Sequence, residues 1–189
     1  MPFTFTPTAI ADVIEVEPKQ FPDGRGFFAE LYKSTDFKAA GITVGLCQVN
    51  QSRSQKNVLR GLHYQLKPQA QAKLVAVLRG EIFDVAVDIR KGSPTFGHWV
   101  GATLSETNKK MLYLPEGFAH GFCAISDEVE IMYFCSNEYA AACERSIIWN
   151  DPAIGITWPV AAPILSPKDA GGVLLAAAET NFEYRKACS

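Results

Sequence analysis

The stretch VLRGLHYQ, residues 58–65, carries an arginine and a histidine within a run that otherwise reads as an apolar β-strand. Side chains three residues apart on a regular strand point to opposite faces, which would separate Arg60 from His63. Gly61 lies between them, and glycine permits a bulge or bend that changes this alternation. If the guanidinium and the imidazole serve one pocket, we therefore predict an irregular strand at Gly61.

Arg60 and Lys73 are cations in a region of apolar strands. Burying such a charge without an anion costs several kcal/mol. A bound phosphate or carboxylate would supply that anion. An internal salt bridge with Asp84 or Asp88 would supply it equally well, so a ligand site is one of two explanations.

The chain has three histidines, His63, His98 and His120, so a metal site would draw on few ligands. The HxH spacing that places two imidazoles on one strand face is absent. A site built from His63, His120 and a distant carboxylate is an alternative that spacing leaves open. We predict no metal. No serine nucleophile elbow, Walker loop or dinucleotide fingerprint is present either, which leaves proton transfer as the expected chemistry.

Two glycine-containing stretches carry further charged or titratable groups. FPDGRGFFAE, residues 21–30, suits a tight loop that presents a guanidinium, although an ordinary surface turn has the same composition. PEGFAHGF, residues 115–122, reads as a turn followed by a strand in which His120 sits among small residues.

The elements that must position these groups are strands. From about Val44 to Trp158 short β-like runs alternate with Gly, Pro, Asn and Ser, which predicts an all-β sandwich, jelly roll or barrel. In IFDVAVDIR the apolar residues 83, 85, 87 and 89 share one face, while KLVAVL before it is apolar on both faces. We expect the two runs to form a hairpin that turns at Gly80.

Further strands are expected at GHWVGATL, KKMLYLP, AHGFCAI, VEIMYFC and RSIIWN. In VEIMYFC the alternation places Tyr133 on the apolar, inward face, a position that a core tyrosine would also occupy. STDFKAAG predicts a short helix with Ser34 or Thr35 as its cap and Gly41 as its end. The last twenty residues read as an arm or loop, with one helical turn at most.

Bulk composition is that of a globular protein. A length of 189 residues fits one domain, and 48% hydrophobic with 20% charged residues is close to average. The net charge is −2 and no Lys/Arg-rich run occurs, so the long-range field that gathers nucleic acid or anionic lipid is absent. An anionic ligand must therefore be small and bound by a local cluster.

Five cysteines, an odd number without CxxC spacing, follow an N-terminus that lacks a basic start and an apolar core. A reducing cytoplasm is the expected location. The longest apolar or glycine run, residues 170–178, is much shorter than the roughly 20 residues that a membrane-spanning helix needs. We expect no membrane span.

Several stretches, taken in order, resemble the dTDP-4-dehydrorhamnose 3,5-epimerase family, sugar-nucleotide enzymes of the cupin superfamily. They are RGLHYQ, QAKLVAVLRGEIFDVAVDIRKGSPTFGHWVG, LPEGFAHGF, IMYFCSNEY and WNDPAIGITWP. The resemblance runs from about Phe21 to Asp169. It implies an all-β, cupin-type jelly roll over residues 1–189 with residues 170–189 as a C-terminal arm, no metal or cofactor, and a homodimer that exchanges strands or arms.

The resemblance also assigns roles. It implies that His63 is the catalytic base, that Asp169 of LSPKDA orients it, that Tyr133 is the proton donor and that Lys73 lies near the C4 carbonyl oxygen of the sugar. Positions that bind the nucleotide or sugar in the family are Arg25, Glu30, Gln48, Asn50, Arg60, Lys73, His120, Glu144 and Lys168, with Tyr139 stacking on the thymine. Val49 departs from the family, where aspartate is frequent, which puts base selectivity in doubt.

The implied reaction converts dTDP-4-dehydro-6-deoxy-D-glucose to dTDP-4-dehydro-L-rhamnose, by proton removal and return at the two carbons that flank a ketone. An imidazole of pKa about 6.5 and a phenol of pKa about 10 suit that chemistry. Two alternatives stay open. One is a relative that inverts only C3 or C5, or acts on another nucleotide-linked keto sugar; the other is a non-catalytic or metal-dependent sugar-binding cupin.

Overall fold

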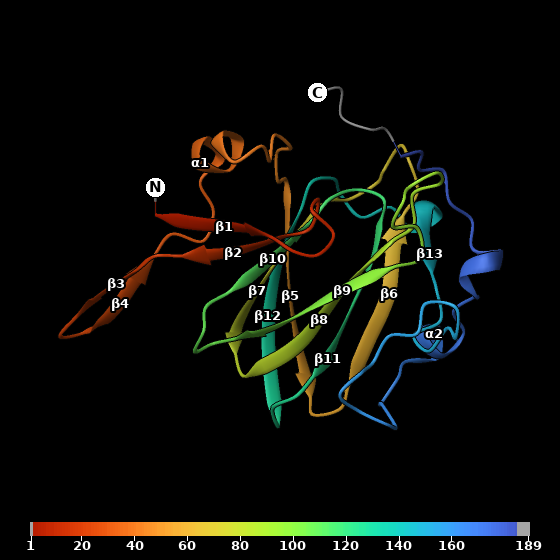
Figure 1. Ribbon diagram of the computed structural model, residues 1–189. Coiled ribbons are helices and arrows are strands. Elements are labelled where there is room, and N and C mark those ends of the chain that lie inside the picture. The colour runs from red at the N-terminus through yellow and green to blue at the C-terminus, as the bar shows by residue number, and fades with distance from the viewer. Residues whose placement is uncertain (1, 185–189) are drawn as a thin grey trace.

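The computed structural model describes residues 2–184, and they form an antiparallel β-sandwich with short helices (Figure 1). Residues 185–189, and with them Cys188 and the end of the expected C-terminal arm, lie outside the described part. The larger sheet has the order β1 (Phe3–Pro7), β2 (Ile14–Pro18), β10 (Met111–Leu114), β7 (Lys73–Arg79), β12 (Glu128–Cys135) and β5 (Gln48–Gln55). The smaller sheet has the order β13 (Glu144–Ser146), β6 (Leu59–Gln65), β11 (Phe118–Ala124), β8 (Glu81–Asp88) and β9 (Trp99–Ser105).

The main hydrophobic core lies between the two sheets. Val75, Leu112 and Ile131 enter it from the larger sheet, and Ile82 and Phe122 enter it from the smaller one, all of them buried. This arrangement is the expected all-β jelly roll of the cupin type, in which the inward faces of two sheets share one core.

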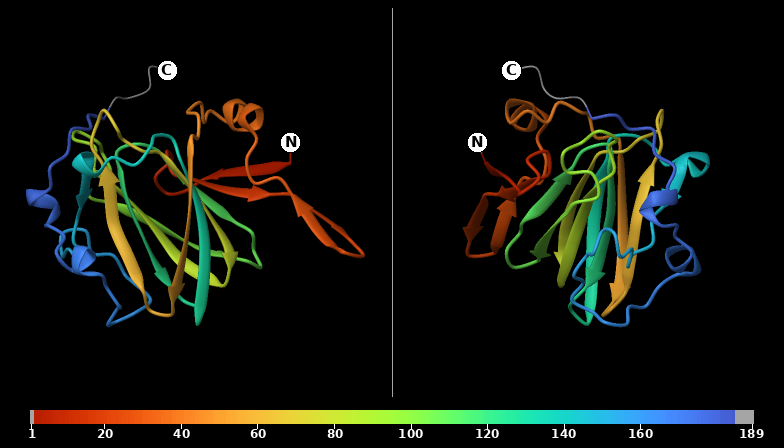
Figure 2. Two further views of the ribbon diagram at one scale, coloured as in Figure 1. Left: turned by 180° about the vertical axis from the view of Figure 1, so that it is seen from behind. Right: turned by 45° about the vertical axis from the view of Figure 1, so that its right-hand side comes forward.

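Each sheet is also covered on its outer face. A second apolar cluster, including Phe37 of helix α1 (Ser34–Ala39), packs on the larger sheet. A third, including Leu175 and Phe182, packs on the smaller sheet, and Figure 2 shows the C-terminal segment running along that side. The C-terminal segment contains helix α2 (Pro167–Ala170) and a 3-10 turn (Leu175–Ala177), and another 3-10 turn (Ala141–Cys143) precedes β13.

The alternation in residues 83–89 is confirmed, because these apolar residues share the face of β8 that the C-terminal segment covers. Gly80 has the positive φ expected of a turn, +76°. The hairpin prediction is wrong. β7 pairs with β10 and β12, whereas β8 pairs with β11 and β9, so the corner at Gly80 carries the chain from one sheet to the other.

Other expectations are confirmed in part. Helix α1 is present and Gly41 follows it with a φ of +87°, but the residue at the N-cap is Lys33 and no side chain caps the helix, so the predicted cap is wrong. Of RSIIWN only Arg145 and Ser146 are in a strand, β13. Strands β1 and β2, which extend the larger sheet, were not predicted from the sequence.

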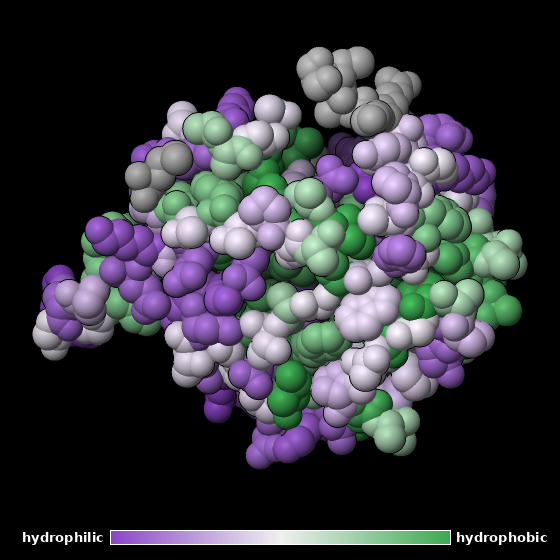
Figure 3. All heavy atoms as spheres, in the orientation of Figure 1, coloured by the Kyte–Doolittle hydropathy of each residue, from purple (hydrophilic) through white to green (hydrophobic). Residues whose placement is uncertain are grey.

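A two-stranded hairpin of β3 (Gln20–Asp23) and β4 (Gly26–Ala29) pairs with neither large sheet and projects from the body at the left of Figure 1. Figure 3 shows hydrophilic and hydrophobic side chains interspersed over this face, with the hydrophilic ones most frequent toward the hairpin. Within residues 2–184, no helix has both the length and the apolar character needed to cross a membrane.

Candidate active site

Strand β6 is irregular at Gly61, which is the condition under which Arg60 and His63 can share one pocket. Gly61 has a φ of +128°, and a Cβ atom there would lie 2.5 Å from Gly121 Cα of the neighbouring β11. The pairing of the two strands shifts register between His120 and Phe122. Because of this bulge Arg60 and His63 line the same cavity, instead of pointing to opposite faces of the sheet.

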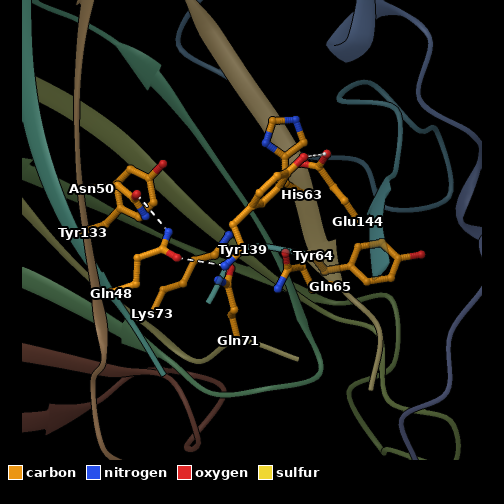
Figure 4. A pocket seen from close by; sticks show the side chains of 10 residues that line it. All are labelled: Gln48, Asn50, His63, Tyr64, Gln65, Gln71, Lys73, Tyr133, Tyr139 and Glu144. Atoms are coloured by element: carbon orange, nitrogen blue, oxygen red, sulfur yellow. Dashed lines mark hydrogen bonds between the residues drawn. The ribbon is translucent and has the colours of Figure 1, made fainter. Parts of the chain in front are cut away.

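The cavity lies at the inner side of the sandwich and has two adjoining chambers of about 440 and 240 Å³. Both chambers are lined by His63, Lys73, Tyr133 and Glu144. Figure 4 shows His63 on β6 and Tyr133 on β12 at opposite sides of the cavity. The larger chamber adds Gln48, Asn50, Tyr64, Gln65, Gln71 and Tyr139, and the smaller one adds Ser52, Arg60, His120, Phe122, Ile131 and Lys168.

His63 is held by a buried carboxylate. Its Nε2 atom lies 2.6 Å from Oδ1 of Asp169, whose side chain is 5% exposed. Ser166 caps helix α2 and donates through Oγ to Asp169 Oδ2 (2.6 Å), and the backbone N–H of Gly61 donates to Oδ1 (3.1 Å). Burial raises the pKa of Asp169, but the hydrogen bonds from His63, Ser166 and Gly61 outweigh it and lower the pKa to about 2.

Lys73 and Tyr133 are the other two groups shared by both chambers. Burial lowers the pKa of Lys73, and the neighbouring Cys135, Asp84 and Glu144 oppose that change. Burial raises the pKa of Tyr133 above its ordinary value, and the nearby Arg60 opposes the increase. The phenol is therefore protonated at neutral pH, as a proton donor must be.

A chain of polar contacts joins residues that line the two chambers. Tyr139 donates through its hydroxyl to Glu144 Oε2 (2.9 Å), and Glu144 Oε1 forms an ion pair with Lys168. Gln48 accepts the backbone N–H of Tyr139 (2.8 Å) and donates to Asn50 Oδ1 (3.0 Å). Burial raises the pKa of Glu144, but the contacts with Lys168 and Tyr139 lower it by more. The net pKa of Glu144 is therefore below its ordinary value.

The smaller chamber contains a second imidazole–carboxylate contact, between His120 Nε2 and Asp84 Oδ1 (2.8 Å). Arg60 donates to Ser54 Oγ (3.1 Å) and to a backbone carbonyl, and it forms no ion pair with a carboxylate of residues 2–184. Asp88 is bound instead by Arg90. The internal salt bridge that would explain Arg60 and Lys73 without a ligand is therefore absent from this part of the chain.

Two of the predicted binding residues do not reach this cavity. Arg25 is at the tip of the β3–β4 hairpin, where its side chain is 91% exposed and pairs with Asp23 (2.6 Å). Glu30 follows the same hairpin and lines neither chamber. Val49, whose identity raised doubt about base selectivity, also lines neither chamber and is exposed on the opposite face of β5 from Gln48 and Asn50.

Several residues at the site were not identified from the sequence. Gln65 is buried and holds the segment on both sides of Tyr139, because its side chain accepts the backbone N–H of Ala140 (2.7 Å) and donates to the carbonyls of Glu138 and Gln69. Its place two residues after His63 on one strand would have indicated the shared face. Ser166 before a proline carries a helix-cap signal, whereas Ser52 and Gln71 carry none. Tyr64 points away from the cavity in Figure 4.

Within residues 2–184 no cluster of three or more His, Cys, Asp and Glu side chains is arranged to hold a metal ion. His63 and His120 are neighbours across β6 and β11, but each imidazole contacts a different carboxylate. The arrangement is instead suited to proton transfer. An imidazole–carboxylate pair and a phenol face one cavity from opposite sides, with an amine in the same cavity.

Comparisons with known proteins agree with this geometry. Residues 7–177 match the sequence model of the family described as dTDP-4-dehydrorhamnose 3,5-epimerase. A dTDP-4-dehydrorhamnose 3,5-epimerase of Shigella flexneri is 57% identical over 166 residues, which cover 87% of this chain and 92% of that protein. A dTDP-4-dehydrorhamnose 3-epimerase of Streptomyces niveus is 44% identical over 173 residues, 91% of this chain and 84% of that protein.

Among solved structures, the dTDP-6-deoxy-D-glucose-3,5-epimerase of Legionella pneumophila, crystallised with dTDP-4-keto-L-rhamnose, superposes with a TM-score of 0.94. It is 46% identical, and the match covers 97% of this chain and 100% of that one.

Proposed function

The chain belongs to the dTDP-4-dehydrorhamnose 3,5-epimerase family, and from this premise we propose that it converts dTDP-4-dehydro-6-deoxy-D-glucose to dTDP-4-dehydro-L-rhamnose. The enzyme is then an isomerase that inverts C3 and C5. The observation that carries the proposal is the shared cavity of His63, Lys73 and Tyr133, with Asp169 bound to the imidazole. Binding alone requires no acid and base on opposite sides of a cavity.

In the proposed mechanism His63 removes the proton next to the C4 ketone. Its Nε2 atom is occupied by Asp169, which leaves Nδ1 as the nitrogen that accepts the proton. The carboxylate stays ionised throughout, since its pKa is about 2, and it stabilises the imidazolium that forms. The role of the pair is thus to orient the base and to make its protonated form favourable.

Removing the proton leaves negative charge on the C4 oxygen. Lys73 is buried in the cavity wall, where a donor to that oxygen is worth more than it would be in water. Tyr133 then returns a proton to the opposite face of the ring, which inverts the carbon. The separation of His63 and Tyr133 on two facing strands supports this division of roles (Figure 4).

The remaining cavity residues are proposed to bind the nucleotide and the sugar. Arg60 and Lys168 bring positive charge to the diphosphate, and an arginine fork matches phosphate oxygens well. Tyr139 lines the larger chamber and is 56% exposed, so a thymine ring can stack on it. The other proposed contacts come from Gln48, Asn50, His120 and Glu144, which line the same two chambers.

We further propose that a second copy of the chain completes the site. The β3–β4 hairpin exposes Phe27 (52%) and Phe28 (65%) beside an apolar groove of about 390 Å³ that also includes Leu78 and Met111. Exposed aromatic side chains next to such a groove favour an interface. In a homodimer that exchanges these hairpins, Arg25 and Glu30 would enter the cavity of the partner.

The described residues are proposed to act as one domain in the cytoplasm. Both large sheets share a single core, and the four cysteines of the described part, Cys47, Cys123, Cys135 and Cys143, are all free thiols. Free thiols are typical of proteins in a reducing compartment.

The test is turnover in D₂O with dTDP-4-dehydro-6-deoxy-D-glucose, followed by NMR of the product. Deuterium at both C3 and C5, with inversion of both, is expected. The Streptomyces niveus relative makes a 3-epimerase the second candidate. Label at C3 alone would establish that candidate and exclude double inversion, and full turnover by a His63→Ala variant would exclude the proposed base.

A further inference from the structure

Ser52 has a buried hydroxyl without a partner in the smaller chamber. It lies on the inward face of β5 between Asn50 and Ser54, and its Oγ atom is enclosed with no hydrogen bond to any residue of the described part. Ser54 differs, since its hydroxyl accepts from Arg60 Nε (3.1 Å). Of the two inward serines, one therefore has a protein partner and the other has none.

An enclosed hydroxyl without a hydrogen bond is costly, and native proteins retain few of them. The residue opposite Ser52 on β12 is Ile131, which offers no polar side-chain atom. Alanine at position 52 would remove the cost, so the fold of the free protein gains nothing from the serine. A partner supplied by a ligand accounts for it.

The proposed substrate narrows the choice of ligand group. In a 4-keto-6-deoxyhexose linked through C1 to a diphosphate, the ring hydroxyls that remain are those at C2 and C3. Tyr139, the residue proposed to stack on the thymine, lines the larger chamber and not the chamber of Ser52. The chamber of Ser52 contains His63 and Lys73 of the proposed catalytic set, so it receives the sugar end of the nucleotide. Phe122 and Ile131 give the same chamber an apolar wall, which suits the C6 methyl group.

We propose that Ser52 is a specificity-determining residue that hydrogen-bonds a ring hydroxyl of the hexose, at C2 or C3. The inference rests on the proposed function and adds to it a contact that selects among sugars. A site that hydrogen-bonds a substrate hydroxyl rejects the analogue that lacks it, because the polar group of the site is then left unpaired.

Calorimetric binding of two ligands tests the proposal. dTDP carries no sugar, and dTDP-6-deoxy-D-glucose carries the hexose but cannot react, because it has no ketone. A Ser52→Ala variant is expected to bind dTDP as the wild type does and the sugar nucleotide about three- to tenfold more weakly, the loss of one neutral hydrogen bond. A Ser54→Ala variant is the matched control. It is expected to weaken the binding of both ligands equally, because Arg60 loses its hydrogen bond to Ser54.

The 2-deoxy and 3-deoxy analogues of the sugar nucleotide identify the hydroxyl. Wild-type protein is expected to bind one of them more weakly than the parent compound, and the Ser52→Ala variant is expected to show no such difference. Equal binding of the parent sugar nucleotide by the wild type and the variant would overturn the inference. A loss that is the same for dTDP and the sugar nucleotide would overturn it too.

Chemical unfolding of the free protein separates ligand binding from a structural role. The midpoint for Ser52→Ala is expected to equal or exceed that of the wild type, because an unpaired buried hydroxyl is removed. A clear fall in the midpoint would mean that Ser52 supports the fold. Turnover of the wild type is measured in the same preparation. If the wild type is active and Ser52→Ala binds the sugar nucleotide unchanged, this inference alone is overturned. If the wild type is inactive, the proposed function is contradicted.

Discussion

At His63 two requirements meet, since the imidazole must point into the cavity and must also be fixed by an anion that does not take its proton. Asp169 meets the second requirement because His63, Ser166 and the Gly61 N–H together keep its pKa near 2, so the carboxylate stays ionised. The N–H that stabilises the carboxylate belongs to the same residue whose bulge aims His63. The proposed base and its supporting carboxylate are thus coupled through three consecutive residues of β6, Gly61 to His63.

The pKa of Asp169 makes a prediction about stability. Its folded pKa of about 2 lies below its ordinary 3.8, so the stabilisation is fully present above pH 3.8 and is lost as the pH falls towards 2. The difference in unfolding free energy between wild type and Asp169→Asn is expected to shrink by about 2 kcal/mol between pH 5 and pH 2. Urea unfolding across that range measures it, and a constant difference would contradict the bound carboxylate.

Tyr133→Phe tests the two-sided mechanism. Without the phenol, His63 can still remove a proton and return a solvent deuteron to the same face. We expect exchange at the reactive carbon to persist while formation of inverted product falls about 10²- to 10⁴-fold. NMR in D₂O reports both quantities, and an equal loss of exchange and inversion would show that Tyr133 is not specifically the donor.

At the scale of elements, the C-terminal segment holds Asp169 in place. Beyond α2, Val173 of this segment forms a β-bridge with Ile147. The backbone N–H of Leu175 donates to the buried Asp151 (2.6 Å). Further along, Arg145 pairs with Glu179 (2.7 Å). Because the segment also covers the outer face of the smaller sheet, packing on that sheet and the position of Asp169, the proposed partner of the base, depend on the same contacts.

Strand β6 offers a prediction with a matched control. Gly61→Ala would place a methyl group 2.5 Å from Gly121 Cα, and is expected to cost at least about 3 kcal/mol of stability and most of the activity. Gly92 also has a positive φ, +77°, but its Cβ would meet open space, so Gly92→Ala should cost only about 1 kcal/mol. Urea unfolding and turnover of both variants check this, and equal effects would mean that the close approach at Gly61 is unimportant.

At the scale of the whole molecule, the projecting hairpin keeps Arg25 out of both chambers of the cavity. The hairpin makes no strand pair with the body and exposes its aromatic residues, so little in one chain fixes its position. An exchanged dimer would explain both the exposure of Phe27 and Phe28 and the absence of Arg25 from the chambers of its own chain.

Subunit mixing tests this exchange. An Arg25→Ala chain and a His63→Ala chain are each expected to be nearly inactive alone. After denaturation and refolding as an equal mixture, about half of the dimers are mixed, and one of their two sites is intact if Arg25 crosses over, so about a quarter of wild-type activity returns. If Arg25 served its own chain, every site would carry a defect and no activity would return.

Local sequence determined what depends on near neighbours along the chain. The alternation in β8 and β12 predicted which residues share a face, Tyr133 included, because strand geometry fixes the direction of successive side chains. Gly61 marked the position where a bulge would let Arg60 and His63 share a pocket. The quoted stretches identified the family and the predicted site residues that line the cavity, with Arg25 and Glu30 as the exceptions.

Only the tertiary structure decided which strands are partners. Periodicity says which face of β7 and β8 is apolar but not which sheet each joins, because pairing depends on distant strands and on the core between them. For the same reason Ser52 could not be identified as a site residue from the sequence. Its lack of a hydrogen-bond partner depends on Ile131, which is 79 residues later in the chain. The place of Arg25 depends on a further step, association with another chain, which no pattern within residues 21–30 encodes.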